Sequence, residues 1–248
     1  MPTPAKPTLH LLGGIAIDGI ASDAADRLLS QTKVVGFLAF LSLAPDGRLQ
    51  RRDKLAALLW PELDQEHARA ALRKVVLITR KEIGADALPR RGDEDLLLNR
   101  EFLGCDATRF LELAEAGQVA PALELYHGEL LPGFHIPDCA DFGLWLDAER
   151  AALSERASAA AWTLALNLEA SKQLTEAGKK ARDAIRFEWS NERVLRRTML
   201  MLVRIGDRTG ALKAFEDSSR RMRAELETEP SEETVRLAAA IRKGETVG

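Results

Sequence analysis

Hydrophobic and polar residues alternate at the start of the chain and then recur at helical spacing. The stretch "TLHLLGGIAIDG" at residues 8–19 alternates loosely and ends in the turn-prone pair Asp18-Gly19, which predicts a small hairpin or meander. From Gln31 onward the apolar residues recur at spacings of one and three. This spacing predicts a helix whose buried face contains Val34, Val35, Leu38 and Leu41.

Two further helices follow the helix-breaking stretch "APDGR". The stretch "RRDKLAALLW" at residues 51–60 predicts a helix that ends at Trp60, because Pro61 disfavours helical geometry in the residue before it. A third helix contains "RAALRKVVLITRKEIG", residues 69–84, and Gly84 stands where a helix C-terminal cap favours glycine.

The stretch "ALPRRGDEDLLLN" comes after the third helix and contains two short extended runs. These runs flank Arg91-Gly92-Asp93, and they predict a two-stranded wing. The order is then a small sheet, three helices and a hairpin, which is the order of a winged helix-turn-helix module. We expect this module to occupy residues 8–105.

Beyond Asp106 the pattern is helical almost to the end of the chain. One long helix carries an apolar stripe made of Leu146, Leu153, Ala157, Ala160, Leu164 and Leu168. Three segments share a glycine nine residues before an aromatic residue: Gly117 to Tyr126, Gly178 to Phe187, and Gly206 to Phe215. In tetratricopeptide-type repeats a turn glycine opens the second helix of each pair. A helical-repeat domain over residues 106–244 is therefore predicted.

The third helix divides into two faces when its residues are placed at about 100° per residue. One face is aliphatic and predicts core packing for Leu72, Val75, Val76, Thr79 and Ile83. The outer face has Arg69, Arg73 and Arg80 on one edge and Lys74 and Lys81 on the other, with Ala70 and Leu77 between them. Cations at the edges and small or apolar residues between them suit a helix in the DNA major groove.

A basic helix face is more often only a solvated surface, so its position in the chain matters. This helix is the third of the module, and the predicted wing after it contains Arg90 and Arg91, which favours DNA contact. We expect Arg69 and Arg73, near the helix start, to contact bases through their planar guanidinium groups. The apolar pair Leu77-Ile78 is instead typical of a protein contact, and the charges of the acidic wing residues Asp93–Asp95 oppose the approach of phosphate.

The chain has 35 Lys and Arg residues against 38 Asp and Glu, a formal net charge of −3, so any nucleic-acid site must be local. No apolar run approaches the roughly 20 residues that span a bilayer, and the first residues lack a secretory signal pattern. We therefore expect a cytoplasmic protein without membrane contact. Two cysteines without CxxC spacing are too few for a disulfide framework.

Signals for enzymatic chemistry or cofactors are weak. The chain contains no G-x-x-x-x-G-K-[ST] phosphate loop, and no Ser or Cys has an evident paired base. Cys105, His127, His135 and Cys139 match no common zinc spacing, and Pro137 interrupts the alignment of the last two. A ligand cage of Tyr126, Trp145, Trp162 and Trp189 is one reading, but such aromatics more often pack a repeat core. We expect no enzyme activity, no metal and no cofactor.

At this point the sequence resembles the bacterial antibiotic regulatory proteins, the SARP family, which join a winged helix to a bacterial transcriptional activator domain. The resemblance covers residues 8–242. It rests in the first half on "RRDKLAALLWPELDQEHARAALRKVV", "RKEIGADAL" and "CDATRF". In the second half it rests on "YHGELLPGF", "WLDAER", "MLMLVRIGDRTGALKAF" and "ELETEPSEETVRLAAAI".

This resemblance implies binding to double-stranded promoter DNA, commonly by side-by-side protomers on direct repeats, followed by recruitment of RNA polymerase. Arg69, Arg73, Lys74 and Leu77 fall where the family reads the major groove, and Arg90 and Arg91 fall in the wing. The loop of Pro61, Glu62, Leu63, Asp64 and Gln65 matches a segment that can face polymerase in such winged helices. A homodimer, on DNA or through the repeat domain, is also an expected partner.

Two positions depart from the family pattern. Leu77-Ile78 replaces a polar or basic pair, and Glu188–Glu192 stands where a DPxxE pattern is usual. The sequence thus predicts a mainly α protein with a small β component, a winged helix-turn-helix followed by tetratricopeptide-like repeats. Its predicted function is sequence-specific activation of transcription. The alternative is a protein-interaction adaptor that does not bind DNA.

Overall fold

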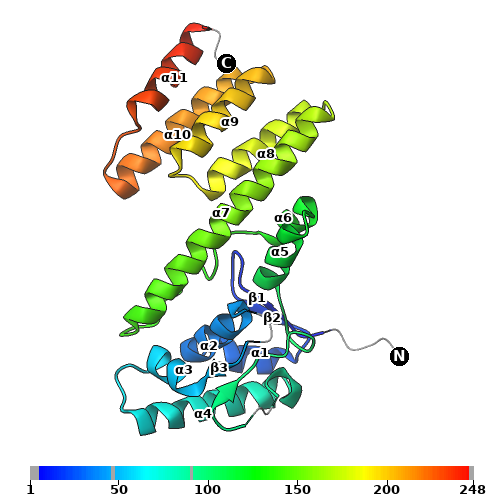
Figure 1. The fold of residues 1–248 in the computed structure, drawn as a ribbon, viewed down its shortest axis with the longest axis vertical. Coiled ribbons are helices and arrows are strands. Elements are labelled where there is room, and N and C mark those ends of the chain that lie inside the picture. Colours follow the sequence, from blue (N-terminus) through cyan, green and yellow to red (C-terminus); the bar gives the residue numbers. More distant parts are fainter. Residues whose placement is uncertain (1–5, 46–47, 90–91, 246–248) are drawn as a thin grey trace. The chain divides into compact units, whose positions relative to one another are not determined.

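A computed structural model describes residues 6–45, 48–89 and 92–245 (Figure 1). The chain forms two compact units. The first comprises residues Met1–Leu113 and Glu124–Leu153, and the second comprises Ala114–Leu123 and Ser154–Gly248. The predicted division into sequence domains at residues 105 and 106 stays a proposal.

The first unit begins with the predicted hairpin. Strands β1 (Thr8–His10) and β2 (Ala16–Asp18) pair antiparallel, with Leu9 opposite Ile17. A third strand, β5 (Gly104–Cys105), pairs in parallel with the other edge of β1, and the sheet order is β2-β1-β5. The hairpin is confirmed, whereas the parallel partner comes from a point far along the chain and leaves no local signal.

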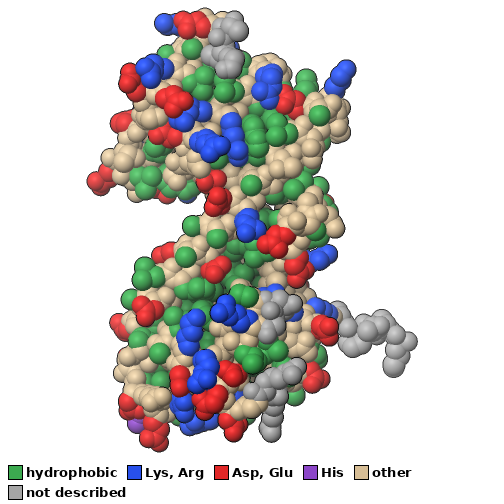
Figure 2. Space-filling view, viewed as in Figure 1, with side chains coloured by type: hydrophobic (Ala, Val, Ile, Leu, Met, Phe, Trp, Pro, Cys, Tyr) green, Lys and Arg blue, Asp and Glu red, His purple; other side chains and the backbone are tan. Residues whose placement is uncertain are grey.

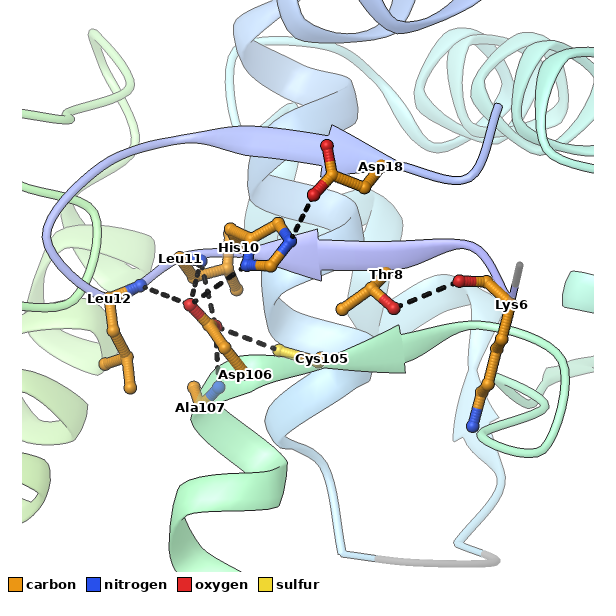
Figure 3. Close-up of polar contacts among 9 residues, drawn as sticks. All are labelled: Lys6, Thr8, His10, Leu11, Leu12, Asp18, Cys105, Asp106 and Ala107. Atoms are coloured by element: carbon orange, nitrogen blue, oxygen red, sulfur yellow. Dashed lines mark hydrogen bonds and ion pairs between the residues drawn. The ribbon is translucent and has the colours of Figure 1, made fainter. Parts of the chain in front are cut away.

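The carboxylate of Asp106 joins these strands to the next helix (Figure 3). It is buried, and it accepts hydrogen bonds from the backbone N–H groups of Leu11 at 2.9 Å, Leu12 at 3.1 Å and Ala107 at 2.6 Å. His10 lies between Asp106 and the exposed Asp18, and its Nε2 is 3.0 Å from Asp18 Oδ2. A buried carboxylate is tolerated when several donors replace its lost hydration. Asp106 therefore fixes the end of β1 beside the start of α5 (Asp106–Glu115).

Four helices fill the space between the sheet and the predicted wing: α1 (Ser22–Leu29), α2 (Thr32–Leu43), α3 (Arg52–Leu59) and α4 (Gln65–Glu82). The last three agree with the sequence prediction. α2 is buried on nearly all sides, so it is the central helix of this unit. The prediction of three helices was wrong because α1 is short and buries only Ala24 and Leu28, which is too weak a pattern to detect.

The prediction of a hairpin around Arg91-Gly92-Asp93 was also wrong in its pairing. The run after this turn forms β4 (Asp95–Leu96), which pairs antiparallel with β3 (Gln50–Arg51), the strand just before α3. The run before the turn follows the short 3-10 helix η1 (Ala85–Ala87). There Leu88 is fully buried and its carbonyl oxygen accepts a hydrogen bond from Arg80 Nε at 2.9 Å. That carbonyl is therefore bound to α4 rather than to a neighbouring strand.

The segment before the long helix α7 (Ala140–Ala170) is held by one arginine. The guanidinium of Arg150 donates to the carbonyl oxygens of Leu130 at 3.0 Å, Leu131 at 2.6 Å and Phe134 at 3.2 Å. Five rigidly placed N–H donors allow one arginine to satisfy several carbonyls that no strand or helix would otherwise bind. This contact joins the stretch "YHGELLPGF" to the stretch "WLDAER".

The second unit is a stack of helices, as predicted. It contains α8 (Leu174–Phe187), α9 (Glu192–Arg204), α10 (Arg208–Leu226) and α11 (Glu232–Lys243), together with the later part of α7 and most of α6 (Val119–Leu125). α8 to α11 lie in succession, with consecutive helices side by side (Figure 1). Their core combines large residues of α9 with small residues of the neighbouring helices: Leu195, Met199 and Leu202 with Ala161, Ala184 and Ala211.

The three repeat glycines have two different roles. Gly117 and Gly206 lie in turns before α6 and α10, with φ of 72° and 88°, conformations that favour glycine. Gly178 lies inside α8, so its predicted turn position was wrong. A Cβ there would stand 2.8 Å from Ile205 Cδ1, so this glycine permits close helix packing. The turn before α8 instead uses Lys172, whose φ is 60°.

A carboxylate of α9 caps the last helix. Glu192 Oε2 accepts hydrogen bonds from Ser231 N at 2.9 Å, Ser231 Oγ at 2.6 Å and Thr234 Oγ1 at 2.5 Å. The negative charge also lies at the N-terminus of α11, where the helix dipole favours it. Burial raises the pKa of Glu192, but these hydrogen bonds outweigh burial and the net pKa is lowered.

We predict that Asp106→Ala destabilises the first unit by about 2 to 4 kcal/mol, because the N–H groups of Leu11 and Leu12 lose their acceptor. Urea unfolding followed by the fluorescence of Trp60 and Trp145, both in this unit, measures the change. Asp18→Ala is the matched control, because its carboxylate is exposed and its ion pair with His10 contributes little. Equal effects of the two substitutions would contradict the role given to Asp106.

We predict that acid weakens the attachment of α11. Because the folded-state pKa of Glu192 is below its unfolded value, the stabilisation is complete above the unfolded pKa and is lost as pH falls through the folded pKa. The difference in melting temperature between wild type and Glu192→Gln should therefore be larger at neutral pH than at about pH 3. A difference that stays constant across this range would show that the charge of Glu192 is not involved.

Candidate nucleic-acid interface

Helices α3 and α4 form a helix-turn-helix pair. α3 ends at Leu59, and Trp60 leaves helical geometry just before Pro61, as predicted. Asp64 begins the next helix, because its side chain accepts a hydrogen bond from the backbone N–H of His67 at 3.0 Å. The helix ends at Glu82 with Ile83 as its C-cap residue, followed by Gly84 with φ of 135°. The candidate recognition helix is therefore fixed at both ends by local sequence.

The two faces of α4 are those that the sequence predicts. Its aliphatic face is buried and consists of Leu72, Val75, Val76, Thr79 and Ile83. On the opposite face Arg73 and Lys74 are exposed, and the side chain of Leu77 is 64% exposed. In the part of the chain that the structure describes, Arg73 and Lys74 make no ion pair. These three side chains project from the helix to solvent.

Arg69 is held by carboxylates from outside the helix. Its Nη2 lies 2.7 Å from Asp53 Oδ2 and 3.4 Å from Glu94 Oε2, and its Nε also donates to Asp53. The hydrogen bonds and charge of Arg69 lower the pKa of the Asp53 carboxyl. This two-point contact joins the start of α4 to the first turn of α3. The guanidinium predicted to read bases is thus engaged within the protein.

Arg80 and Lys81 differ in how far the rest of the protein binds them. Arg80 is half-buried and holds the Leu88 carbonyl, so it ties α4 to the segment that follows. The side chain of Lys81 is 78% exposed, and its Nζ lies 3.5 Å from Glu82 Oε1. Glu82 is itself buried and bound by Arg27 at 2.7 Å, so Lys81 keeps most of its contact with water. Of this pair, only Lys81 is placed to meet a partner.

A groove of about 460 Å³ lies at the arginine edge of α4, between this helix, the start of α3 and residues 92–94. Its walls combine arginines of α3 and α4, apolar side chains of α4 and residues before β4: Arg52, Arg69, Arg73, Arg80, Leu72, Val76, Leu77, Gly92, Asp93 and Glu94. Over α3 and α4, Lys and Arg side chains lie beside Asp and Glu side chains and do not form a continuous basic patch (Figure 2). Of the acidic residues that the sequence places in the wing, Asp93 and Glu94 line the groove.

Arg52 is a candidate that the sequence pattern did not single out. It lines the groove from the start of α3, and its buried Nε has no hydrogen-bond partner among the described residues. A buried donor without a partner costs free energy unless a ligand or water accepts its hydrogen bond. Asp53 and Glu94 were missed as partners of Arg69, because only the packing of α3 and β4 against α4 brings them together.

The remaining predicted site residues lie in two loops. Arg90 and Arg91 are outside the described residues. Pro61, Glu62, Leu63, Asp64 and Gln65 are all exposed. The base of this loop is held by Lys33, whose Nζ donates to the Leu59 carbonyl and lies 3.7 Å from Glu62 Oε1. Lys33, a residue of α2, thus anchors the base of the loop.

The residues considered for other chemistry are mostly packed. Cys105 and Cys139 are buried free thiols, and burial raises the pKa of Cys105 to about 11. Trp145 packs against Phe40 at 4.9 Å between ring centres. Within the described ranges, no group of His, Cys, Asp or Glu side chains could hold a metal ion. The same residues include no helix long and apolar enough to cross a membrane.

Comparison with known proteins gives a family and a fold. The model of the bacterial transcriptional activator domain (BTAD) family matches residues 105–242. No curated protein matches the chain. Among solved structures, the chain is similar to Mycobacterium tuberculosis EmbR in complex with a low affinity phosphopeptide, with 19% identity and a TM-score of 0.61. The match covers 98% of this chain and 66% of that chain, and it supports a winged helix followed by helical repeats.

We predict that Asp53 and Arg69 act as a coupled pair in stability. Asp53→Ala and Arg69→Ala should each destabilise the first unit, and the double variant should lose less than the sum of the two, because either substitution breaks the same contact. Urea unfolding at neutral pH measures this cycle. Asp53→Ala combined with Arg73→Ala is the control, and its effects should add. Additive losses for Asp53 and Arg69 would contradict the contact.

Proposed function

Because the chain belongs to the bacterial transcriptional activator domain family, we propose that it is a sequence-specific DNA-binding transcription factor that activates promoters. It is a regulator of the SARP/BTAD type. The specific step is the proposal: the winged helix binds a short promoter site, and the bound protein recruits RNA polymerase. We place this activity in the cytoplasm, where promoter DNA is accessible in bacteria.

The observation that carries the proposal is the outer face of α4. Arg73, Lys74 and Leu77 are exposed together, on the second helix of a helix-turn-helix pair whose other face is buried. An exposed leucine between free cations is unfavourable in water but complements a thymine methyl group in the major groove. The near-neutral charge of the chain does not oppose this, because phosphate binding needs only local cations.

The contacts within the protein divide the predicted residues by role. We propose that Arg73, Lys74 and Leu77 face base edges, while Lys81, Arg52, Arg90 and Arg91 contact phosphates. Arg52 supports this assignment through its donor without a partner in the groove. Arg69 and Arg80 then act as positioning residues, because Asp53 and Leu88 hold them. Arg69 reaches DNA only if it exchanges its carboxylate partners for phosphate or base.

Activation requires a second surface. We propose that the exposed loop from Pro61 to Gln65 contacts RNA polymerase, since it precedes α4 and stays outside the groove that would hold DNA. Protomers would bind side by side on direct repeats, as a homodimer formed on DNA or through the repeat domain.

A second candidate function is a protein-interaction adaptor that does not bind DNA. Glu94 supports it, because this carboxylate lies 3.4 Å from Arg69 within the groove and would repel phosphate. The exposed Leu77 supports it as well, since an apolar residue on a surface can bind a protein. Under this reading the groove along α4 holds a peptide.

Selection from random duplex DNA separates the two candidates. The purified chain is mixed with a random-sequence library at low salt, and the retained fragments are sequenced. Enrichment of a short motif, repeated in direct orientation, supports the regulator. Retained folding by circular dichroism with no enriched motif favours the adaptor.

We predict that Arg73→Ala lowers affinity for the selected site by about 1 to 3 kcal/mol and relaxes preference at one base position. Lys81→Ala should instead weaken binding to all sequences alike and reduce the dependence of affinity on salt, because it removes one phosphate contact. Fluorescence anisotropy with matched and mismatched duplexes at several salt concentrations measures both effects. If the two variants behave alike, the division between base and phosphate contacts is wrong.

A further inference from the structure

The second unit contains a groove of about 590 Å³ between α8 and α10. Its floor is apolar and includes Ile185, Trp189 and Ala214. Trp189 lies in the loop between α8 and α9 and is only partly buried. Trp162, also partly buried, packs beneath Arg197 at 4.5 Å but does not line this groove. Trp189 is therefore an aromatic residue of this unit that lines an open groove.

The rim of the groove is mainly basic. Arg186, Lys213 and Arg221 are exposed around the apolar floor, and the side chain of Arg186 is 69% exposed. Lys213 makes no ion pair with any residue that the structure describes. Two carboxylates also line the groove, but each faces a cation: Asp207 is 2.7 Å from Arg182, and Asp217 is 3.4 Å from Arg220. Arg186 also has a partner, Asp183 at 3.0 Å, and Arg221 has Glu225 at 2.7 Å. Among the described residues that line the rim, the charge without an ion pair is thus the positive charge of Lys213.

Arg221 is held in place by Trp189 and Glu225. The guanidinium carbon of Arg221 lies 4.2 Å from the centre of the Trp189 ring, which is a cation–π contact. Arg221 Nε also donates to Glu225 at 2.7 Å, so the arginine is held from its other side. A stacked arginine keeps N–H donors at the ring edge, and it loses little side-chain entropy when a carboxylate binds.

We infer that this groove binds an acidic peptide segment of a partner protein, with one apolar side chain on the Trp189 floor and flanking carboxylates at Lys213, Arg186 and Arg221. Charge complementarity argues for this occupant, because the unpaired rim charge is positive. The apolar floor argues against duplex nucleic acid, whose bases are stacked inside the helix, so that only sugars and phosphates would reach Trp189. Tryptophan and arginine in a concave surface are also the residues that most often dominate protein interfaces.

The test uses the full chain and a fluorescently labelled synthetic peptide in which glutamates flank a central phenylalanine. A peptide with lysines in place of the glutamates is its control. Anisotropy titration should show saturable binding of the acidic peptide that weakens as salt rises, and no binding of the basic one. Lys213→Glu and Trp189→Ala should each weaken binding by roughly tenfold. Lys172→Glu makes the same charge change outside the groove and should leave binding unchanged.

Three outcomes overturn the inference: no saturable binding up to about 1 mM peptide, equal binding of the basic peptide, or equal binding by Lys213→Glu and Lys172→Glu. Light scattering adds a fourth, because self-association that is lost in Lys213→Glu would assign the groove to a second copy of the chain. Lys213 is exposed, so its substitution tests the groove even if Trp189→Ala fails to fold. Lys213→Glu should retain DNA binding, which separates this inference from the proposed function.

Discussion

The buried carboxylate of Asp106 is the constraint on which the first unit depends. One side chain satisfies backbone N–H groups at the end of β1 and at the first turn of α5, although these segments are far apart in sequence. A charge in this position is stable only while the strands keep their register, because each donor replaces part of its lost hydration. The small sheet that supports α2, and through it α3 and α4, is thereby fixed at its centre. A hairpin of such short strands would be marginal without this link.

Internal carboxylates and carbonyls decide which cations of α4 remain for a partner. Asp53 and Glu94 engage Arg69, and the Leu88 carbonyl engages Arg80, so five basic residues in the sequence become a smaller exposed set. This compensation limits attraction to any polyanion, since nonspecific binding grows with the number of phosphates neutralised. If the chain binds DNA as proposed, more of the discrimination between bases falls to Arg73, Lys74 and Leu77. Under the proposed function, such a helix would depend on shape and base contacts more than on charge.

The sequence predicted what depends on local periodicity and missed what depends on distant pairing. The buried face of α4 agrees residue by residue, because a 3.6-residue period and a proline stop are properties of the segment itself. The wing pairing failed because β4 found its partner in β3, across the whole length of α3 and α4. The contact of Arg69 with Asp53 was missed for the same reason, since the two residues face each other only after the helices pack. Gly178 was predicted in a turn because the sequence alone does not distinguish a glycine that forms a turn from one that permits close helix packing.

Both units use arginines to hold segments of the chain in place. Arg150 and Arg80 bind backbone carbonyls, and Arg69 and Arg182 bind carboxylates, so their positive charges are committed to holding segments in place. Arg73 and Lys213 remain exposed beside apolar side chains, Leu77 in one unit and Trp189 in the other. Such a cation does not hold segments together, and the apolar group beside it is unfavourable in water. Neither folding nor solubility therefore accounts for the pair. Both proposed binding surfaces rest on this combination rather than on the number of basic residues.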